Sequence, residues 1–165
     1  MKILAIDSCS NVATAALVCD DVLIAQFSLN DKTTHSTKLL PQIEYMMQNA
    51  QTDFADIDLF AVTVGPGSFT GQRIGVATAK ALAHAVNKPM VGVSALMAMA
   101  YNIKFTDYLI CPIMDARREQ VYTASFKWQN DKLVTIKEDR AMALDDLLEE
   151  IDENVIFFGD GVPVF

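Results

Sequence analysis

Asp7 and Ser8 stand where a first apolar segment ends, and Gly65 and Gly67 stand where a later one ends. Carboxylate and hydroxyl side chains can contact a metal ion or a phosphate, and glycines let backbone N–H groups approach an anion closely. A glycine-rich turn in front of a helix is a common anion-binding arrangement. Asp7, Ser8, Gly65 and Gly67 are therefore weak candidates for a nucleotide site.

A purely structural explanation of the same residues competes with nucleotide binding. Gly65-Pro66-Gly67 lacks the Gly-Lys-Ser/Thr ending of a Walker loop. Ser68 and Thr70 are placed to cap the following helix, and two glycines permit a sharp turn from strand to helix. The hairpin segment at residues 8–11 contains no glycine. We rank capping above phosphate binding.

Metal-ligating and nucleophilic sets are hard to assemble from this sequence. Two histidines one helical turn apart can hold a metal ion, but position 39, one turn after His35, is a leucine. The other histidine, His84, belongs to a different expected helix. The three cysteines have neither a CxxC pair nor regular spacing: Cys9, Cys19 and Cys111. We expect no metal site and no catalytic residue in this chain.

Composition and charge restrict the classes of protein further. Hydrophobic residues make up 52% of the 165 residues, so a sizeable core can form. The net charge of −8 disfavours tight binding to a nucleic acid backbone, which relies on clustered Lys and Arg. Neither a membrane-spanning segment nor a signal peptide is expected. We expect a cytoplasmic globular protein.

The elements that must position the candidates follow an alternating pattern that occurs twice. The first series has strands at 2–7, 13–19, 22–29, 59–64 and 90–93, and helices at about 33–50, 71–86 and 95–101. The second has strands at 109–115, 120–128, 133–137 and 155–158, and a helix at 145–151. We predict an α/β fold with a complete first unit, 1–102, and a second unit, 103–165, that is truncated near its C-terminus. Pro41 is expected near the first turn of its helix.

Two lines of residues recur at helical spacing and could form a contact surface. Leu39, Ile43, Met46 and Ala50 form an apolar line on the first helix. Gly71, Gly75, Ala79 and Ala83 form a line of small residues on the second. Such lines serve either to pack against the chain's own sheet or to dock a partner, and the sequence leaves these alternatives nearly even. In the partner interpretation, the two helices would form a four-helix contact and a homodimer when the chain is alone.

The repeated pattern resembles the actin, hexokinase and Hsp70 superfamily, and four blocks make the resemblance narrower. They are Ile3-Leu4-Ala5-Ile6-Asp7-Ser8; His35-Ser36 with Leu39-Leu40-Pro41; Gly65-Pro66-Gly67-Ser68-Phe69-Thr70-Gly71 with Arg73-Ile74-Gly75; and Asp115-Ala116-Arg117-Arg118 with Val121-Tyr122. These blocks are similar to the TsaB (YeaZ) family. Gln72 departs from the family pattern, which usually has leucine there, and we expect it to alter local packing. The resemblance implies a duplicated actin-like ATPase (ribonuclease H-like) fold.

The resemblance also implies a function, namely a non-catalytic partner of the TsaD enzyme in forming threonylcarbamoyladenosine in tRNA. ATP and a metal would then be held by that partner, with no cofactor in this chain. Further expected partners are other threonylcarbamoyladenosine proteins such as TsaE, and direct tight tRNA binding is not expected. The alternative is an active nucleotide hydrolase or kinase that uses Asp7, Ser8 and the Gly65 to Gly71 turn. A metal-dependent peptidase is a third class.

Overall fold

The computed structural model describes residues 1–30 and 35–164. The chain divides into two units, Met1–Val93 and Ser94–Phe165, and each is described by itself. The expected start of the first helix at residues 33 and 34 lies outside the described residues. Among the helices that the structure describes, none is long and apolar enough to cross a membrane.

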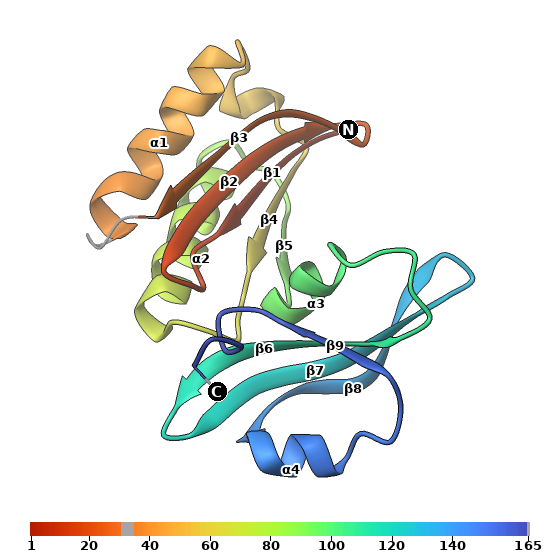
Figure 1. Ribbon diagram of the computed structural model, residues 1–165. Helices are drawn as coiled ribbons and strands as arrows, with labels where there is room; N and C mark the ends of the chain where they lie inside the picture. Colours follow the sequence, from red (N-terminus) through yellow and green to blue (C-terminus); the bar gives the residue numbers. More distant parts are fainter. Residues whose placement is uncertain (31–34, 165) are drawn as a thin grey trace. The chain divides into compact units, whose positions relative to one another are not determined.

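The sheet of the first unit has the strand order β3-β2-β1-β4-β5 (Figure 1). Its strands are β1 (Lys2–Asp7), β2 (Val12–Cys19), β3 (Val22–Asn30), β4 (Leu59–Thr63) and β5 (Met90–Val93). The first three form an antiparallel meander, while β4 pairs parallel with both β1 and β5. Asp20 and Asp21 both have positive φ, as the tight turn of a two-residue hairpin requires.

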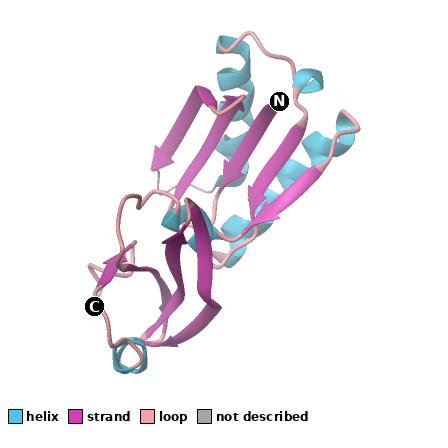
Figure 2. Cartoon of the chain, turned by 90° about the vertical axis from the view of Figure 1, so that its right-hand side faces the viewer, coloured by secondary structure: helices cyan, strands magenta, loops and turns pink. Residues whose placement is uncertain are grey.

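Helices cover one face of this sheet, as Figure 2 shows. They are α1 (His35–Asn49) and α2 (Phe69–Ala85), and the short 3-10 helix η1 (Phe54–Asp56) lies between them in the chain. Alternate residues of β1, such as Leu4 and Ile6, point into the core together with Ile43 of α1 and Ala79 of α2. Our prediction for Pro41 is wrong, because α1 begins at His35 and Pro41 lies beyond its first turn.

The second sheet, β8-β7-β6-β9, repeats the order β3-β2-β1-β4. Its elements are β6 (Leu109–Arg117), β7 (Gln120–Gln129), β8 (Lys132–Ala143), α4 (Leu144–Glu149) and β9 (Val155–Phe158). The β7–β8 turn, Asn130-Asp131, has positive φ at both residues like the turn between β2 and β3. The predicted repetition of the series of strands and helices is therefore present in the folded chain.

The division between the units differs from the predicted boundary at residue 102. Helix α3 (Ala95–Ala100) belongs to the second unit, where it packs on β6 and β7. Ala95, Leu96 and Ala100 are buried there. The apolar residues of this short helix cannot be assigned to either neighbouring sheet from sequence spacing alone, which is why the predicted boundary falls nine residues later than the boundary in the fold.

Candidate functional site

The hairpin turn between β1 and β2 packs directly on the first turns of α2. The Ser8 hydroxyl is buried and donates to the Gly71 carbonyl oxygen over 2.8 Å. A Cβ on Gly71 would lie 2.0 Å from the Ser8 carbonyl oxygen, and one on Gly75 would lie 2.4 Å from Ser8 Oγ. Side chains at these two helix positions would collide with the turn, so both glycines serve close packing between turn and helix.

Gly67 and Ser68 show the same close approach at the entrance of the helix. Gly67 has a φ of +147°, and a Cβ there would lie 2.2 Å from the Cys9 carbonyl oxygen. That oxygen accepts a hydrogen bond from the Ser68 backbone N–H over 2.6 Å. Ser68 Oγ in turn caps the helix by accepting from Gly71 N over 3.2 Å, as the capping prediction states. Thr70 instead lies within the first turn of α2.

Asp7 is engaged by its own chain as well. Its Oδ1 accepts from the Cys9 backbone N–H over 2.9 Å and from the Thr63 hydroxyl. The Cys9 thiol lies 3.1 Å from Thr63 Oγ1, so a hydrogen-bonded series runs from the thiol through the hydroxyl to the carboxylate. Burial raises the pKa of Cys9 to about 11, which keeps this thiol protonated near neutral pH and unsuited to nucleophilic attack.

The structure therefore brings the four nucleotide candidates together, but assigns them other contacts. Asp7, Ser8 and Gly67 are described above, and a Cβ on Gly65 would lie 2.5 Å from Gln72 Nε2. Gln72, the residue that departs from the family pattern, thus packs over the turn as expected for a local effect. In this arrangement a backbone carbonyl oxygen, rather than a phosphate, accepts a hydrogen bond at the N-terminus of α2.

Our candidate contact surface is wrong in its residues. Burial places them in the core of the first unit or beside it: Leu39, Ile43, Met46, Gly71, Gly75, Ala79 and Ala83 are buried, and Ala50 packs against the same core. The small residues of α2 allow the helix to approach its own sheet and hairpin turn. The alternative of packing against the chain itself is the correct one for both lines.

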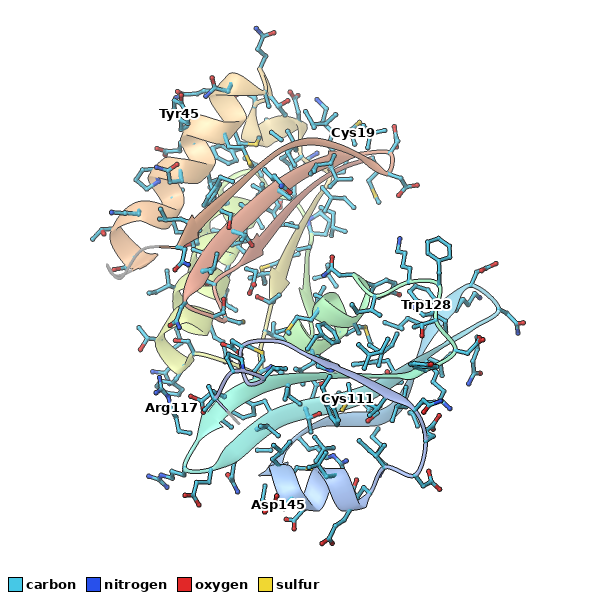
Figure 3. The ribbon with its side chains drawn as sticks, viewed as in Figure 1. Cys19, Tyr45, Cys111, Arg117, Trp128 and Asp145 are labelled. Atoms are coloured by element: carbon cyan, nitrogen blue, oxygen red, sulfur yellow. The ribbon has the colours of Figure 1, made fainter. Side chains whose placement is uncertain are left out.

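The opposite sides of the two helices carry exposed apolar residues that the spacing argument missed. Tyr45 on α1 (Figure 3) is 66% exposed and Phe69 on α2 is 67% exposed, and Leu40 is also exposed. The Arg73 guanidinium lies 3.7 Å from the centre of the Phe69 ring, which holds the ring in place by a cation–π contact. The signal in the sequence is weak, because these residues do not recur at helical spacing along their helices.

The second unit repeats the turn geometry with a different surface. Arg117 N donates to Asp115 Oδ1 over 2.7 Å, as Cys9 N donates to Asp7. Gly159 has a φ of +117°, and a Cβ there would lie 2.3 Å from the Ile113 carbonyl oxygen. Arg117, Arg118 and Glu119 all have positive φ and are exposed, so this turn presents bulky side chains on the surface.

No group of three metal-ligating side chains gathers anywhere in the part of the chain that the structure describes. The side chain of His35 lies outside the described residues, and His84 is exposed in the last turn of α2. Cys111 is buried beside Thr123 and Ser125, and burial raises its pKa, so it also remains a thiol. Whether the protein holds a metal stays a prediction.

Comparison with known proteins is consistent with this geometry. The family model of TsaD, tRNA N6-adenosine threonylcarbamoyltransferase, matches residues 23–165. The chain is 38% identical over 162 residues to the tRNA threonylcarbamoyladenosine biosynthesis protein TsaB of Bacillus subtilis, covering 96% of this chain and 71% of that protein. It is 34% identical to TsaB of Escherichia coli, covering 91% of this chain and 65% of that protein.

Solved structures are similar in fold. YeaZ from Pseudomonas aeruginosa aligns with a TM-score of 0.76 and 24% identity, over 86% of this chain and 67% of that one. A second Pseudomonas aeruginosa protein, described as similar to peptidase YeaZ, aligns with a TM-score of 0.81 and 20% identity, over 96% and 83%. The duplicated actin-like ATPase fold that the sequence predicts is confirmed.

Proposed function

Because the chain belongs to the TsaB (YeaZ) family, we propose that it takes part in forming threonylcarbamoyladenosine in tRNA as a non-catalytic subunit. In this proposal it associates with a TsaD-like catalytic relative and supports that enzyme. The family supplies the pathway. The observation that carries the non-catalytic part is the hydrogen bond from Ser68 N to the Cys9 carbonyl at the start of α2.

This hydrogen bond matters because the N-terminus of a helix following a glycine turn is where a phosphate would otherwise bind. A phosphate there would have to displace the Cys9 carbonyl. The hydrogen bond from the Ser8 hydroxyl to the Gly71 carbonyl oxygen fixes the turn that carries this carbonyl. Asp7 is likewise bonded to Cys9 N and Thr63. Nucleotide hydrolysis by this chain would require the hairpin turn to rearrange. ATP and a metal are accordingly assigned to the partner.

Association is proposed to use the exposed sides of α1 and α2 in place of the buried lines. Large apolar side chains exposed on a folded surface are typical of contact sites. Tyr45 and Phe69 are of the residue type that most often anchors interfaces, and the Arg73 contact limits the entropy lost when Phe69 is buried. Because each copy offers the same surface, a homodimer would form without the partner and would exclude it.

The remaining parts of the proposal follow from charge and from the pathway. A chain with a net charge of −8 contributes little to gripping tRNA, so tRNA binding is assigned to the catalytic relative. Other threonylcarbamoyladenosine proteins such as TsaE would join the assembly of the two.

Co-purification of the chain with the TsaD-like relative from the same genome tests the proposal. The double variant Tyr45→Ser/Phe69→Ser should lose pairing by at least about tenfold while retaining its thermal unfolding temperature, because both side chains are exposed. Tyr108→Ser, which removes an exposed tyrosine in the second unit, is the matched control. Full pairing by the double variant contradicts the surface. ATP turnover by the lone chain that Asp7→Ala abolishes supports the alternative, an active hydrolase or kinase.

A further inference from the structure

A pocket of the second unit, remote in sequence from the hairpin turn and α2, combines aromatic walls with acidic side chains. It has a volume of about 620 Å³, within the size range of small-ligand sites. Residues from two segments line it, the connection after α3 and the end of β7 with the turn that follows: Tyr101, Lys104, Phe105, Thr106, Asp107, Trp128, Asn130 and Asp131. None of these residues takes part in the proposed association surface.

Trp128 forms the fixed wall of this pocket (Figure 3). Its indole Nε1–H donates to the Ile103 carbonyl oxygen over 2.7 Å. Tyr101 meets its ring edge-on, with centroids 5.7 Å apart and an angle of 83° between the planes. Since the only donor of the indole is used, Trp128 can offer a ligand its π-system but no hydrogen bond.

Phe105 adds a third aromatic side chain at the rim. It is fully exposed and has a φ of +58°, a backbone conformation that is uncommon for a large non-glycine residue. Because the Phe105 side chain is fully exposed, it contributes no burial free energy to the fold. A conformation of this kind often marks a functional position.

The charges that line the pocket select the sign of a ligand. Asp107 and Asp131 are exposed carboxylates, and Lys104 is the only cation among the lining residues. No ion pair among the described residues includes any of the three. Two unpaired carboxylates on a chain with net charge −8 disfavour a phosphate or carboxylate ligand, and attract a cation.

We propose that this pocket binds an organic cation, an alkyl guanidinium or ammonium group, between the aromatic faces of Trp128 and Phe105 and the carboxylates of Asp107 and Asp131. A cation over an aromatic face gains electrostatic attraction from the ring quadrupole, most strongly with tryptophan. The carboxylates supply the hydrogen-bond acceptors that guanidinium and ammonium groups need. The cation is either a free polyamine or an arginine or lysine side chain of another protein.

Intrinsic fluorescence tests this directly, because Trp128 is the chain's only tryptophan. The probes are spermidine and N-acetylarginine amide, with N-acetylglutamine amide as the uncharged counterpart. We expect a saturable change in Trp128 emission with a cationic probe and none with the glutamine amide. Saturation by spermidine alone assigns a free polyamine, saturation by the arginine amide alone assigns a protein side chain, and saturation by both supports the shared cation chemistry.

Variants separate the pocket from general attraction to an acidic protein. Asp107→Asn/Asp131→Asn should weaken the cation's binding by about tenfold, since two exposed charge pairs are lost. Glu149→Gln/Asp152→Asn removes the same charge at exposed positions outside the pocket and should leave binding unchanged. Thermal unfolding of both variants checks that they are folded. The proposal is overturned if neither cationic probe saturates, if the glutamine amide binds equally well, or if both variants weaken binding equally.

Discussion

The Ser68 backbone N–H donates to the Cys9 carbonyl oxygen over 2.6 Å, and this bond joins the first hairpin turn to the start of α2. Gly67, Gly71 and Gly75 have no side chains to obstruct this contact. The turn and the glycine block therefore form one packed unit, although nearly sixty residues separate them in the chain. The non-catalytic role proposed for the protein depends on this unit remaining closed.

Gly71→Ala should destabilise the protein, because the added methyl group would lie 2.0 Å from the Ser8 carbonyl oxygen. Overpacking of this kind typically costs about 1–3 kcal/mol, while the better helix propensity of alanine returns at most ~1 kcal/mol. Urea unfolding measures the difference. Gly92→Ala, where the nearest atom belongs to the Val64 side chain rather than to the backbone, is the control and should cost less. A gain in stability at Gly71 would show that turn and helix are not in contact.

Ala79→Leu tests where the small residues of α2 point. Ala79 is completely buried, so the larger side chain should lower the free energy of unfolding by about 1–3 kcal/mol. Ala77→Leu, on the exposed side of the same helix, should change it by no more than about 0.5 kcal/mol. Equal effects of the two substitutions in urea unfolding would contradict the observed orientation of α2.

Cys9 predicts a loss of stability in alkali. Burial raises its pKa from 9.0 to about 11, so between these values the unfolded chain releases the proton while the folded chain keeps it. The unfolded state is then favoured increasingly, and the free energy of unfolding should fall as the pH rises from about 9 to 11. Urea unfolding across this range should show a shallower fall for Cys9→Ala. Parallel pH profiles for the two proteins would mean that Cys9 is not protected in the fold.

Glu150 of the second unit should make the protein lose stability in acid, as Cys9 does in alkali. Hydrogen bonds from Arg140 and Lys137 lower the pKa of Glu150 to about 2. Stability from this carboxylate is present above its unfolded pKa near 4.5 and is lost as the pH falls from there toward 2. In Glu150→Gln the thermal unfolding temperature should therefore fall less steeply as the pH is lowered. The same substitution at its exposed neighbour, Glu149→Gln, should leave this pH dependence unchanged. If Glu150→Gln has the same pH dependence as the wild-type protein, the hydrogen bonds of Glu150 with Arg140 and Lys137 do not stabilise the fold.

Much of the fold could be predicted because local signals agree with the tertiary structure. Alternating and continuous apolar segments located every strand. The recurrence of the series of strands and helices was also predicted, and in the structure the order β8-β7-β6-β9 repeats β3-β2-β1-β4. Strand β8 was predicted too short, because its polar second half has no apolar alternation to mark it as a strand.

The candidate site was less accessible from sequence. The spacing of Gly71, Gly75 and Ala79 indicates a close approach, but not of what; only the fold shows that Ser8 and the sheet lie there. The exposed Tyr45 and Phe69 carry no periodic signal, since neither belongs to a series of apolar residues repeated at helical spacing. Segments distant in the chain determine which side of each helix is buried and which is exposed. Helical periodicity alone contains no information about these segments.

The non-catalytic role can be tested by the rate of threonylcarbamoyladenosine formation on tRNA, measured with the TsaD-like relative and a saturating amount of the Asp7→Asn variant. Asparagine Oδ1 can still accept the hydrogen bonds from Cys9 N and Thr63, so the fold is preserved while the carboxylate charge is removed. If the chain is non-catalytic, the rate should lie within about twofold of that with the wild-type chain, and the relative should form no product when this chain is left out. A loss of about 10²-fold or more in a folded, fully paired variant, the size expected when a catalytic group is removed, would contradict it.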